Sequence, residues 1–442
     1  MHQPKKLIEV AMPVKEVSEE SVRDKSIRHG HLSTLHLWWA RRPLPVCRAV
    51  VFASLVPDPL DEHCPPAFAE AVKTLLKGSP YRPYDDIPFT TAVDPMADNL
   101  RNRLLMFIGK FSDKFLRLER QGKSCPAKDK LSDHSLIKWD NKNNERILNI
   151  ARKLIWVAHH AEREPKANSH QLIAAFDRHY QAIKTAEKAL YETKDRHLPT
   201  PGVQQKEAVL QQAIEAFLDR MPRVFDPFAG GGAIPLEAAR LGCRSYGNDI
   251  NPVAHIIQKG SLEFPQKYGK PITYSAAEFK KRYGTKALQE AKEAGQVFGE
   301  EVQIANRLAF DVEFFAKELL GRVEKEVGQY YPAGENGKET IAYYWARVGK
   351  CSNPACGARV PLLRQFYLSR KSGKYIHLAP IIKGNEIDFE IKEGKTDLSG
   401  WINRGNLKCP CCENVTEAKA LKRQSLVDDS DNHRMLAVII DG

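Results

Sequence analysis

Residues 226–232 read Asp-Pro-Phe-Ala-Gly-Gly-Gly, and this stretch decides the fold. The residues before it, "RVF", have the character of a short strand. The residues after it, "AIPLEAARLG" at 233–242, repeat apolar side chains at helical spacing and end in a glycine. "CRSYGNDI" at 243–250 then predicts a second strand. This order predicts a βαβ unit with a glycine turn at the carboxyl end of its first strand, where open α/β sheets bind ligands.

Three classes of ligand use a glycine turn of this kind. A P-loop needs Gly-Lys-Ser or Gly-Lys-Thr after the turn, which is missing, and a dinucleotide turn needs a third glycine where Pro235 stands. Asp226 would repel a pyrophosphate, whereas the ammonium and sulfonium groups of S-adenosylmethionine favour a nearby carboxylate. Asp249 follows the second strand, in a position to accept hydrogen bonds from both ribose hydroxyls. The alternative is that this stretch binds no ligand and is an ordinary tight turn with an Asp that caps the helix.

The sequence therefore predicts an S-adenosylmethionine site in a Rossmann-like sheet. Its expected cofactor-binding residues are the glycine turn and the end of the second strand: Asp226, Pro227, Phe228, Ala229, Gly230, Gly231, Gly232, Asp249 and Ile250.

Composition limits the partners and the compartment. The 442 residues carry a formal net charge of +12, which favours a polyanionic partner such as DNA. No apolar run is long enough to span a membrane, and the amino terminus lacks the apolar core of a signal peptide. The nine cysteines are an odd number and unevenly placed, unlike a secreted disulfide framework. We expect a cytoplasmic protein without a membrane partner.

Five of the cysteines lie late in the chain and predict a metal site. Cys351 and Cys356 have C-x4-C spacing, and Cys409 and Cys412 have C-x2-C spacing. Two such pairs suit a tetrahedral thiolate site, for which Zn²⁺ is the usual occupant inside cells. Four thiolates leave no open coordination position, so the expected role of the zinc is structural. Cys411 stands beside Cys412, and its spacing alone does not decide whether it is a ligand.

Basic and aromatic residues surround these cysteines. Residues 350–408 contain eleven Lys and Arg against five Asp and Glu, with Phe366, Tyr367, Tyr375 and Trp401 interleaved. This pattern suits contact with phosphates and stacking on bases, and it equally suits a solvated basic surface over a small aromatic core.

The chain is expected to fall into five regions. They are an amino-terminal region at 1–62, a mostly helical insertion at 63–220, the βαβ region with a long helix at 221–345, a zinc ribbon at 346–424, and the start of a continuing sheet at 425–442.

Three stretches carry a resemblance to a known family. "RHGHLSTLHLWWARRPL" at 28–44, "VFDPFAGGGAIPLEAARLGCRSYGNDINPVA" at 224–254 and "NPACGARVPLLRQFYLSRKSG" at 353–373 resemble the zinc-ribbon-containing adenine-specific DNA methylases. These large bacterial and archaeal proteins often lie among phage-defence genes. The resemblance implies that Trp39, Arg42 and Pro43 line the methionine end of the cofactor. It also implies methylation of adenine N6 in DNA and a setting among other defence-system proteins.

The sequence departs from that family at one important point. Methyltransferases of exocyclic amines hold the flipped base with an Asp/Asn-Pro-Pro-Tyr/Phe turn. The only Pro-Pro here, Pro65–Pro66, has neither the polar residue nor the aromatic residue. The catalytic residues are therefore unknown, and we expect this chain to be an amino-terminal part of a longer or split methylase that needs a carboxy-terminal segment. An RNA guanine-N2 methyltransferase and a non-catalytic cofactor- and nucleic-acid-binding module are the alternatives.

Overall fold

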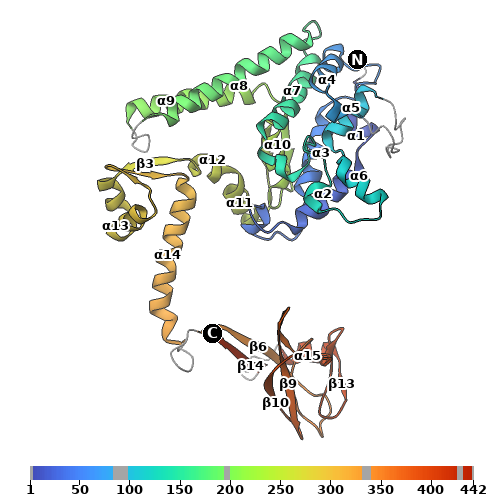
Figure 1. Cartoon of the computed structure of the whole chain (residues 1–442), viewed down its shortest axis with the longest axis vertical. Helices are drawn as coiled ribbons and strands as arrows, with labels where there is room; N and C mark the ends of the chain where they lie inside the picture. Colours follow the sequence, from blue (N-terminus) through green and yellow to red (C-terminus); the bar gives the residue numbers. More distant parts are fainter. Residues whose placement is uncertain (1–2, 83–97, 194–199, 331–339, 426–431, 441–442) are drawn as a thin grey trace. The chain divides into compact units, whose positions relative to one another are not determined.

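The computed structural model describes residues 3–82, 98–193, 200–330, 340–425 and 432–440. They form a mixed α/β protein that divides into two compact units, Met1–Phe315 and Ala316–Gly442. Figure 1 shows the chain coloured from its amino to its carboxyl end.

Helices make up most of the first unit. The long ones have amphipathic sequences that bury one face, and several begin at a residue whose side chain caps the helix, such as Asn168 before α8. In chain order they are α1 Leu7–Val10, α2 Val14–Ser26, α3 Leu44–Leu55, α4 Pro66–Leu75, α5 Leu100–Ile108, α6 Asp113–Arg120, α7 Glu145–Ala161, α8 Ser169–Tyr191 and α9 Pro201–Leu218.

The main hydrophobic core lies among these helices. Phe52 of α3, Phe107 of α5 and Trp156 of α7 are almost completely buried, and Phe52 and Phe107 meet edge to face. The same cluster reaches Ala238 and Leu241, which flank the carboxyl end of the next helix, α10 (Ala233–Arg240). The helical region and the glycine turn therefore share one core.

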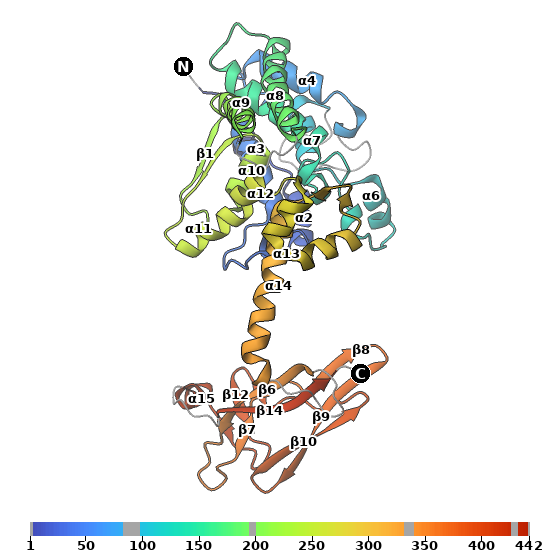
Figure 2. The same cartoon turned by 90° about the vertical axis from the view of Figure 1, so that its left-hand side faces the viewer.

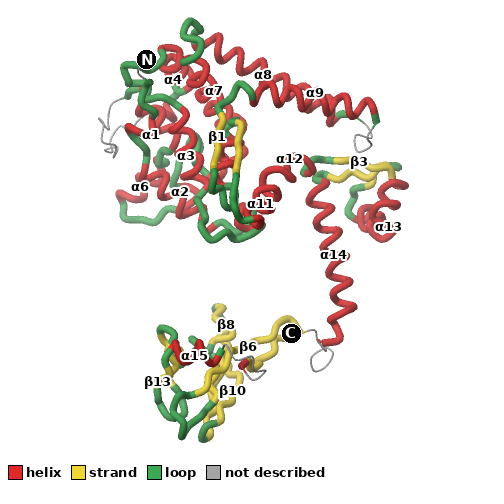
Figure 3. Tube along the Cα trace, turned by 180° about the vertical axis from the view of Figure 1, so that it is seen from behind, coloured by secondary structure: helices red, strands yellow, loops and turns green. Residues whose placement is uncertain are grey.

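The predicted βαβ unit is present. β1 (Arg223–Asp226) and β2 (Arg244–Gly247) pair in parallel through α10, with Phe225 opposite Tyr246 in the register. Figure 3 draws the two strands in yellow within the helical unit. α10 packs against α3 on one side, whereas Phe225 and Tyr246 are 63% and 46% exposed.

The rest of the first unit follows the βαβ unit. It holds α11 (Pro252–Gln258), a π-helical turn at Lys259–Glu263, α12 (Phe264–Tyr268) and α13 (Ala276–Glu293). β3 (Ile272–Ser275), β5 (Glu301–Ile304) and β4 (Val297–Phe298) form a small antiparallel sheet with its own core around Phe279. α14 (Arg307–Val327) spans the boundary between the units.

The second unit consists mostly of short antiparallel strands. They are β6 Thr340–Lys350, β7 Arg359–Pro361, β8 Tyr367–Lys371, β9 Lys374–Lys383, β10 Glu386–Glu393, β11 Ile402–Asn403, β12 Asn406–Lys408, β13 Val415–Thr416 and β14 His433–Ile440, and the helix α15 Ala418–Gln424 lies between β13 and β14 in sequence. They pair in the orders β14-β6-β7, β10-β9-β8 and β11-β12-β13.

Two features differ from the expected Rossmann-like sheet. Within the described residues, the only parallel pairing is the two-stranded β1–β2, so a complete Rossmann sheet is not present there. β14 was expected to begin a continuation of that sheet, but it lies antiparallel to β6 of the second unit (Figure 2). Its apolar run, "MLAVII", fits either pairing, because a strand's sequence does not specify its neighbour.

Candidate functional site

The glycine turn is held by a compact set of hydrogen bonds. At the end of β1, the Asp226 side chain accepts from the Phe228 N–H at 3.0 Å. The N–H of Ala229 donates to the carbonyl oxygen of Asn248 at 2.9 Å, tying the turn to the residues after β2. Asp249 completes the link, because its Oδ2 accepts from the N–H of Gly230 at 2.8 Å. Its Oδ1 accepts from the N–H of Asn251 at 2.9 Å.

Two of the three glycines are required by the backbone. Gly230 and Gly232 have φ of +52° and +82°, in the left-handed region that residues with a Cβ rarely adopt. A Cβ on Gly230 would lie 2.5 Å from the indole Nε1 of Trp38, so the turn approaches that ring closely. The buried Gln258 also reaches the turn and donates its amide to the Gly230 carbonyl at 3.1 Å.

The amino-terminal lead-in reaches the glycine turn. A small cavity of about 40 Å³ lies between them, lined among others by Trp38, Arg42 and Gly231. His31 also lines the cavity. The buried Asp24 holds the His31 ring in place, because His31 Nε2 lies 3.2 Å from both carboxylate oxygens of Asp24. The structure therefore brings together stretches that are nearly 200 residues apart in sequence.

The predicted cofactor residues take different positions around this turn. Phe228, Ile250 and Trp39 are 84%, 98% and 88% exposed, whereas Arg42 lines the cavity. Pro43 precedes the first residue of α3 and so fixes where that helix begins. Trp38, rather than its neighbour Trp39, packs on the glycines.

Two residues that contact the turn, Trp38 and Gln258, are not among those that the sequence predicts. In "WWARRPL" the two tryptophans are indistinguishable without the backbone path. Gln258 lies at the end of α11 as one polar residue among several, and no motif marks it. The π-helical turn that follows it is a feature often found at functional sites and carries no sequence signal of its own.

The two carboxylates of the turn oppose an anionic group beside them, whereas Arg41 and Arg42 line the adjoining small cavity. The N–H groups of Phe228, Ala229, Gly230 and Gly232 are already bonded to acceptors of the chain, two of them carboxylates. A phosphate cradle needs such groups pointing at the ligand. With Asp226 and Asp249 both at the turn, a ligand with positive charge or hydroxyl donors is favoured instead.

The four cysteines form a second candidate site, in the second unit. Their Sγ atoms all lie within 4.8 Å of one another, so Cys351, Cys356, Cys409 and Cys412 could hold a metal ion. Cys351 Sγ lies 3.6 Å from Cys412 Sγ, and Cys356 Sγ lies 3.8 Å from Cys409 Sγ. Cys411 does not belong to this set of four.

Two hairpins present these thiols. Cys351 and Cys356 lie between β6 and β7, and Cys409 and Cys412 lie between β12 and β13. The backbone N–H of Asn414 lowers the pKa of the Cys412 thiol to about 7, whereas burial raises the pKa of Cys351. A bound cation would favour the thiolate form of all four.

Comparison with known proteins adds one match. The model of a family described as "Protein of unknown function (DUF1156)" matches residues 11–74, which include the lead-in to the glycine turn and α3. No curated protein and no solved structure matches the chain. Among the described residues, no helix is both long and apolar enough to cross a membrane.

Proposed function

We propose that this chain binds S-adenosylmethionine at the glycine turn and serves an adenine-N6 DNA methyltransferase, in a phage-defence or restriction-modification setting. One observation carries the proposal: Asp226 and Asp249 flank a glycine turn at the end of the first strand of a parallel βαβ unit. Most N–H groups of this turn already donate hydrogen bonds to acceptors of the chain. A cationic ligand with a ribose fits these groups, and a di- or triphosphate does not.

The proposed residues fit the cofactor in number and kind. An ionised carboxylate offers about four acceptor sites. Asp249 uses one on each oxygen for the Gly230 and Asn251 N–H groups, which leaves acceptor capacity for two ribose hydroxyls. Asp226 would attract the ammonium group, and Arg42 in the small cavity would attract the carboxylate of the methionine moiety. When bound, the cofactor supplies an electrophilic methyl group.

The cysteine cluster is proposed as a structural zinc site. Four thiolates would fill the four positions of a tetrahedral Zn²⁺ and leave no open position for substrate. The zinc would then hold the two hairpins of the second unit together, and its basic surroundings would contact DNA.

Base chemistry is proposed to need a further polypeptide segment. The sequence contains no Asp/Asn-Pro-Pro-Tyr/Phe turn to hold an adenine. Parallel sheets are normally covered on both faces, and the exposed Phe225–Tyr246 pair leaves one face of β1–β2 open to such a segment. We therefore expect no methyl transfer to DNA by these 442 residues alone.

Ligand selectivity tests the proposal. Calorimetric titration should detect S-adenosylhomocysteine and should detect neither NAD⁺ nor ATP, because both carry phosphates that the two carboxylates repel. Binding of NAD⁺ or ATP in preference to S-adenosylhomocysteine would refute the assignment. Robust incorporation of labelled methyl groups into DNA by the 442-residue chain would instead show that its catalytic groups lie elsewhere in this sequence.

A further inference from the structure

A second cavity, remote from the glycine turn in sequence, lies in the helical region of the first unit. It is open, has a volume of about 900 Å³, and is bounded by Ser79–Tyr81, α6 and the loop at 129–138. Its floor is a short antiparallel pairing, in which Phe111 bridges Leu131 and the Ser132 N–H donates to the Lys110 carbonyl at 2.8 Å. We call this cavity the basic groove, after the six cations that line it: Arg82, Lys110, Lys114, Arg117, Arg120 and Lys138.

The groove carries an excess of positive charge. Three carboxylates line it against the six cations, those of Asp113, Asp129 and Asp133, so the formal excess is +3 before His134 is considered. Asp129 pairs with Lys114 at 2.6 Å, and Asp133 pairs with Lys138 at 2.6 Å. Arg82 also lies 3.7 Å from Asp98, which is outside the lining. The lining itself still contains three more cations than carboxylates.

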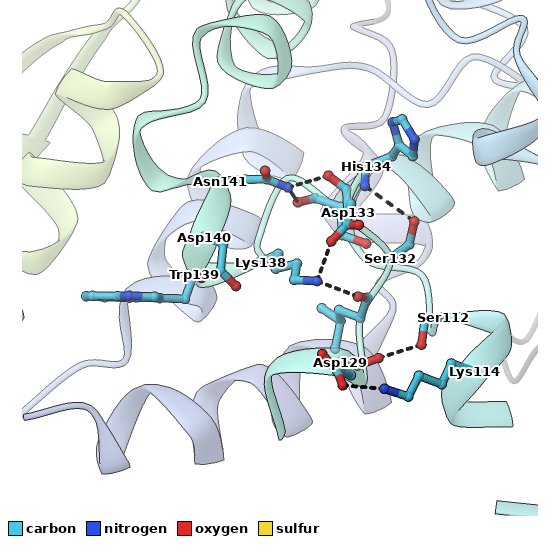
Figure 4. Close-up of polar contacts among 12 residues, drawn as sticks. Ser112, Lys114, Asp129, Ser132, Asp133, His134, Lys138, Trp139, Asp140 and Asn141 are labelled. Carbon is cyan, nitrogen blue, oxygen red and sulfur yellow. Dashed lines mark hydrogen bonds and ion pairs between the residues drawn. The ribbon is translucent and has the colours of Figure 1, made fainter. Parts of the chain in front are cut away.

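Lys138 is a buried cation of the groove, and two acceptors hold its ammonium group. Its side chain is only 7% exposed, yet the carboxylate that pairs with it, on Asp133, is 89% exposed. Figure 4 shows its ammonium between Asp133 and a backbone oxygen, which is the Leu131 carbonyl at 2.9 Å. An ammonium has three N–H donors, and these two contacts use two of them. The ammonium of Lys138 is buried, whereas the carboxylate of Asp133 that pairs with it is exposed to solvent. Because solvent weakens this pairing, a further anion in the groove would be favourable for Lys138.

One face of α6 adds a row of cations. Lys114, Arg117 and Arg120 follow one another at three-residue steps, a spacing that makes each a neighbour of the next on the helix surface, and all three are exposed. Leu116 of the same helix lines the groove beside these cations and is buried in the main core. The row therefore has a fixed support, and its guanidinium groups suit the forked geometry of phosphate oxygens.

We propose that the basic groove binds the phosphodiester backbone of DNA without reading its sequence. The hydroxyl group of Ser132 stands beside the cations, as is usual where proteins contact phosphates, whereas the Ser112 hydroxyl is already bonded to the Asp129 carbonyl. Among the described residues that line the groove, Phe111 and His134 are the aromatic side chains, and two rings do not make a platform for stacking successive bases. The choice of DNA as the polymer rests on the proposed function, whereas the phosphate chemistry rests on the groove.

The test measures DNA binding without cofactor, so that its outcome is independent of the glycine turn. A short fluorescein-labelled duplex is titrated with the full chain at several salt concentrations. Each lost phosphate contact lowers the slope of log K against log salt by about 0.9, so Arg117→Gln/Arg120→Gln should reduce its magnitude by about 2. Arg117→Lys/Arg120→Lys keeps the charge and should keep the slope.

Arg163→Gln/Arg178→Gln is the matched control, because it removes two exposed arginines of the same unit outside the groove. An equal loss of slope in this control, or an unchanged slope in the groove variant, would overturn the proposal. Competitors test the ligand class: displacement of the duplex by ATP or by polyglutamate, at phosphate or carboxylate concentrations matching unlabelled DNA, would overturn the assignment to a phosphodiester chain. Thermal unfolding identical to wild type shows that each variant is folded.

Discussion

Arg48 and Glu237 form a buried ion pair that joins the amino-terminal helix α3 to α10, the helix of the βαβ unit. Arg48 Nε lies 2.5 Å from Glu237 Oε2, and the two side chains are 1% and 0% exposed. Arg48 also donates to the Leu136 carbonyl at 2.8 Å, and Arg240 donates to Glu237 from its own helix. The pair fixes the distance between α3, which follows the Trp38 lead-in, and α10, which follows the glycine turn.

Breaking this pair should destabilise the first unit. Arg48→Met leaves Glu237 buried with only Arg240, and we expect a loss of about 3 kcal/mol in the free energy of unfolding. Equilibrium urea unfolding followed by circular dichroism measures it. Arg48→Met/Glu237→Leu should lose less than the sum of the two single variants, since no charge is then left uncompensated. Additive losses would show that the two residues are not coupled.

The cysteine cluster predicts that four cysteines bind zinc and that Cys411 does not. One Zn²⁺ per chain should copurify, and Cys356→Ser/Cys412→Ser should abolish it, because two of four ligands are lost. Cys411→Ser is the control and should retain the metal, since Cys411 lies outside the set. Elemental analysis of the three proteins decides this. A metal-free wild type, or loss of metal in the Cys411 variant, would contradict the assignment.

Glu16 gives a prediction about pH. It is buried on α2, and burial raises the pKa of its carboxyl from 4.5 to about 7. The protonated form is favoured in the folded state, so its stabilising effect is complete below pH 4.5 and is lost as the pH rises toward 7. Glu16→Gln should therefore raise the free energy of unfolding at pH 8 by up to about 3 kcal/mol, and leave it unchanged at pH 4. Urea unfolding at both pH values tests this, and an equal effect at both would show that Glu16 does not titrate in this way.

The sequence predicted the local features better than the long-range ones. The βαβ unit follows from neighbouring residues, since Gly230 and Gly232 are needed at positive φ and Asp249 lies one strand away. The cysteine pairs were also found by spacing, and they cluster as expected. The pairing of β14 with β6 could not be predicted, because the sequence of an apolar strand does not specify which strand it pairs with.

The sequence also does not predict which of two neighbouring side chains packs inside the protein and which faces solvent. Trp38 packs on the glycine turn and Trp39 points to solvent, a difference set by the backbone path before α3. The ion pair between Arg48 and Glu237 joins residues 189 positions apart, and neither lies in a motif. The basic groove likewise gathers cations from three segments that are unremarkable when read separately.

The central claim is that the glycine turn and Asp249 form a site for S-adenosylmethionine. Calorimetric titration of wild type and Asp249→Ala with S-adenosylhomocysteine tests it most directly, with Asp219→Ala, an exposed Asp outside the turn, as the control. We predict that Asp249→Ala weakens binding by about 1–3 kcal/mol through lost hydrogen bonds to ribose, while Asp219→Ala binds as wild type does. Equal affinity for wild type and Asp249→Ala, or no binding by wild type, would contradict the account.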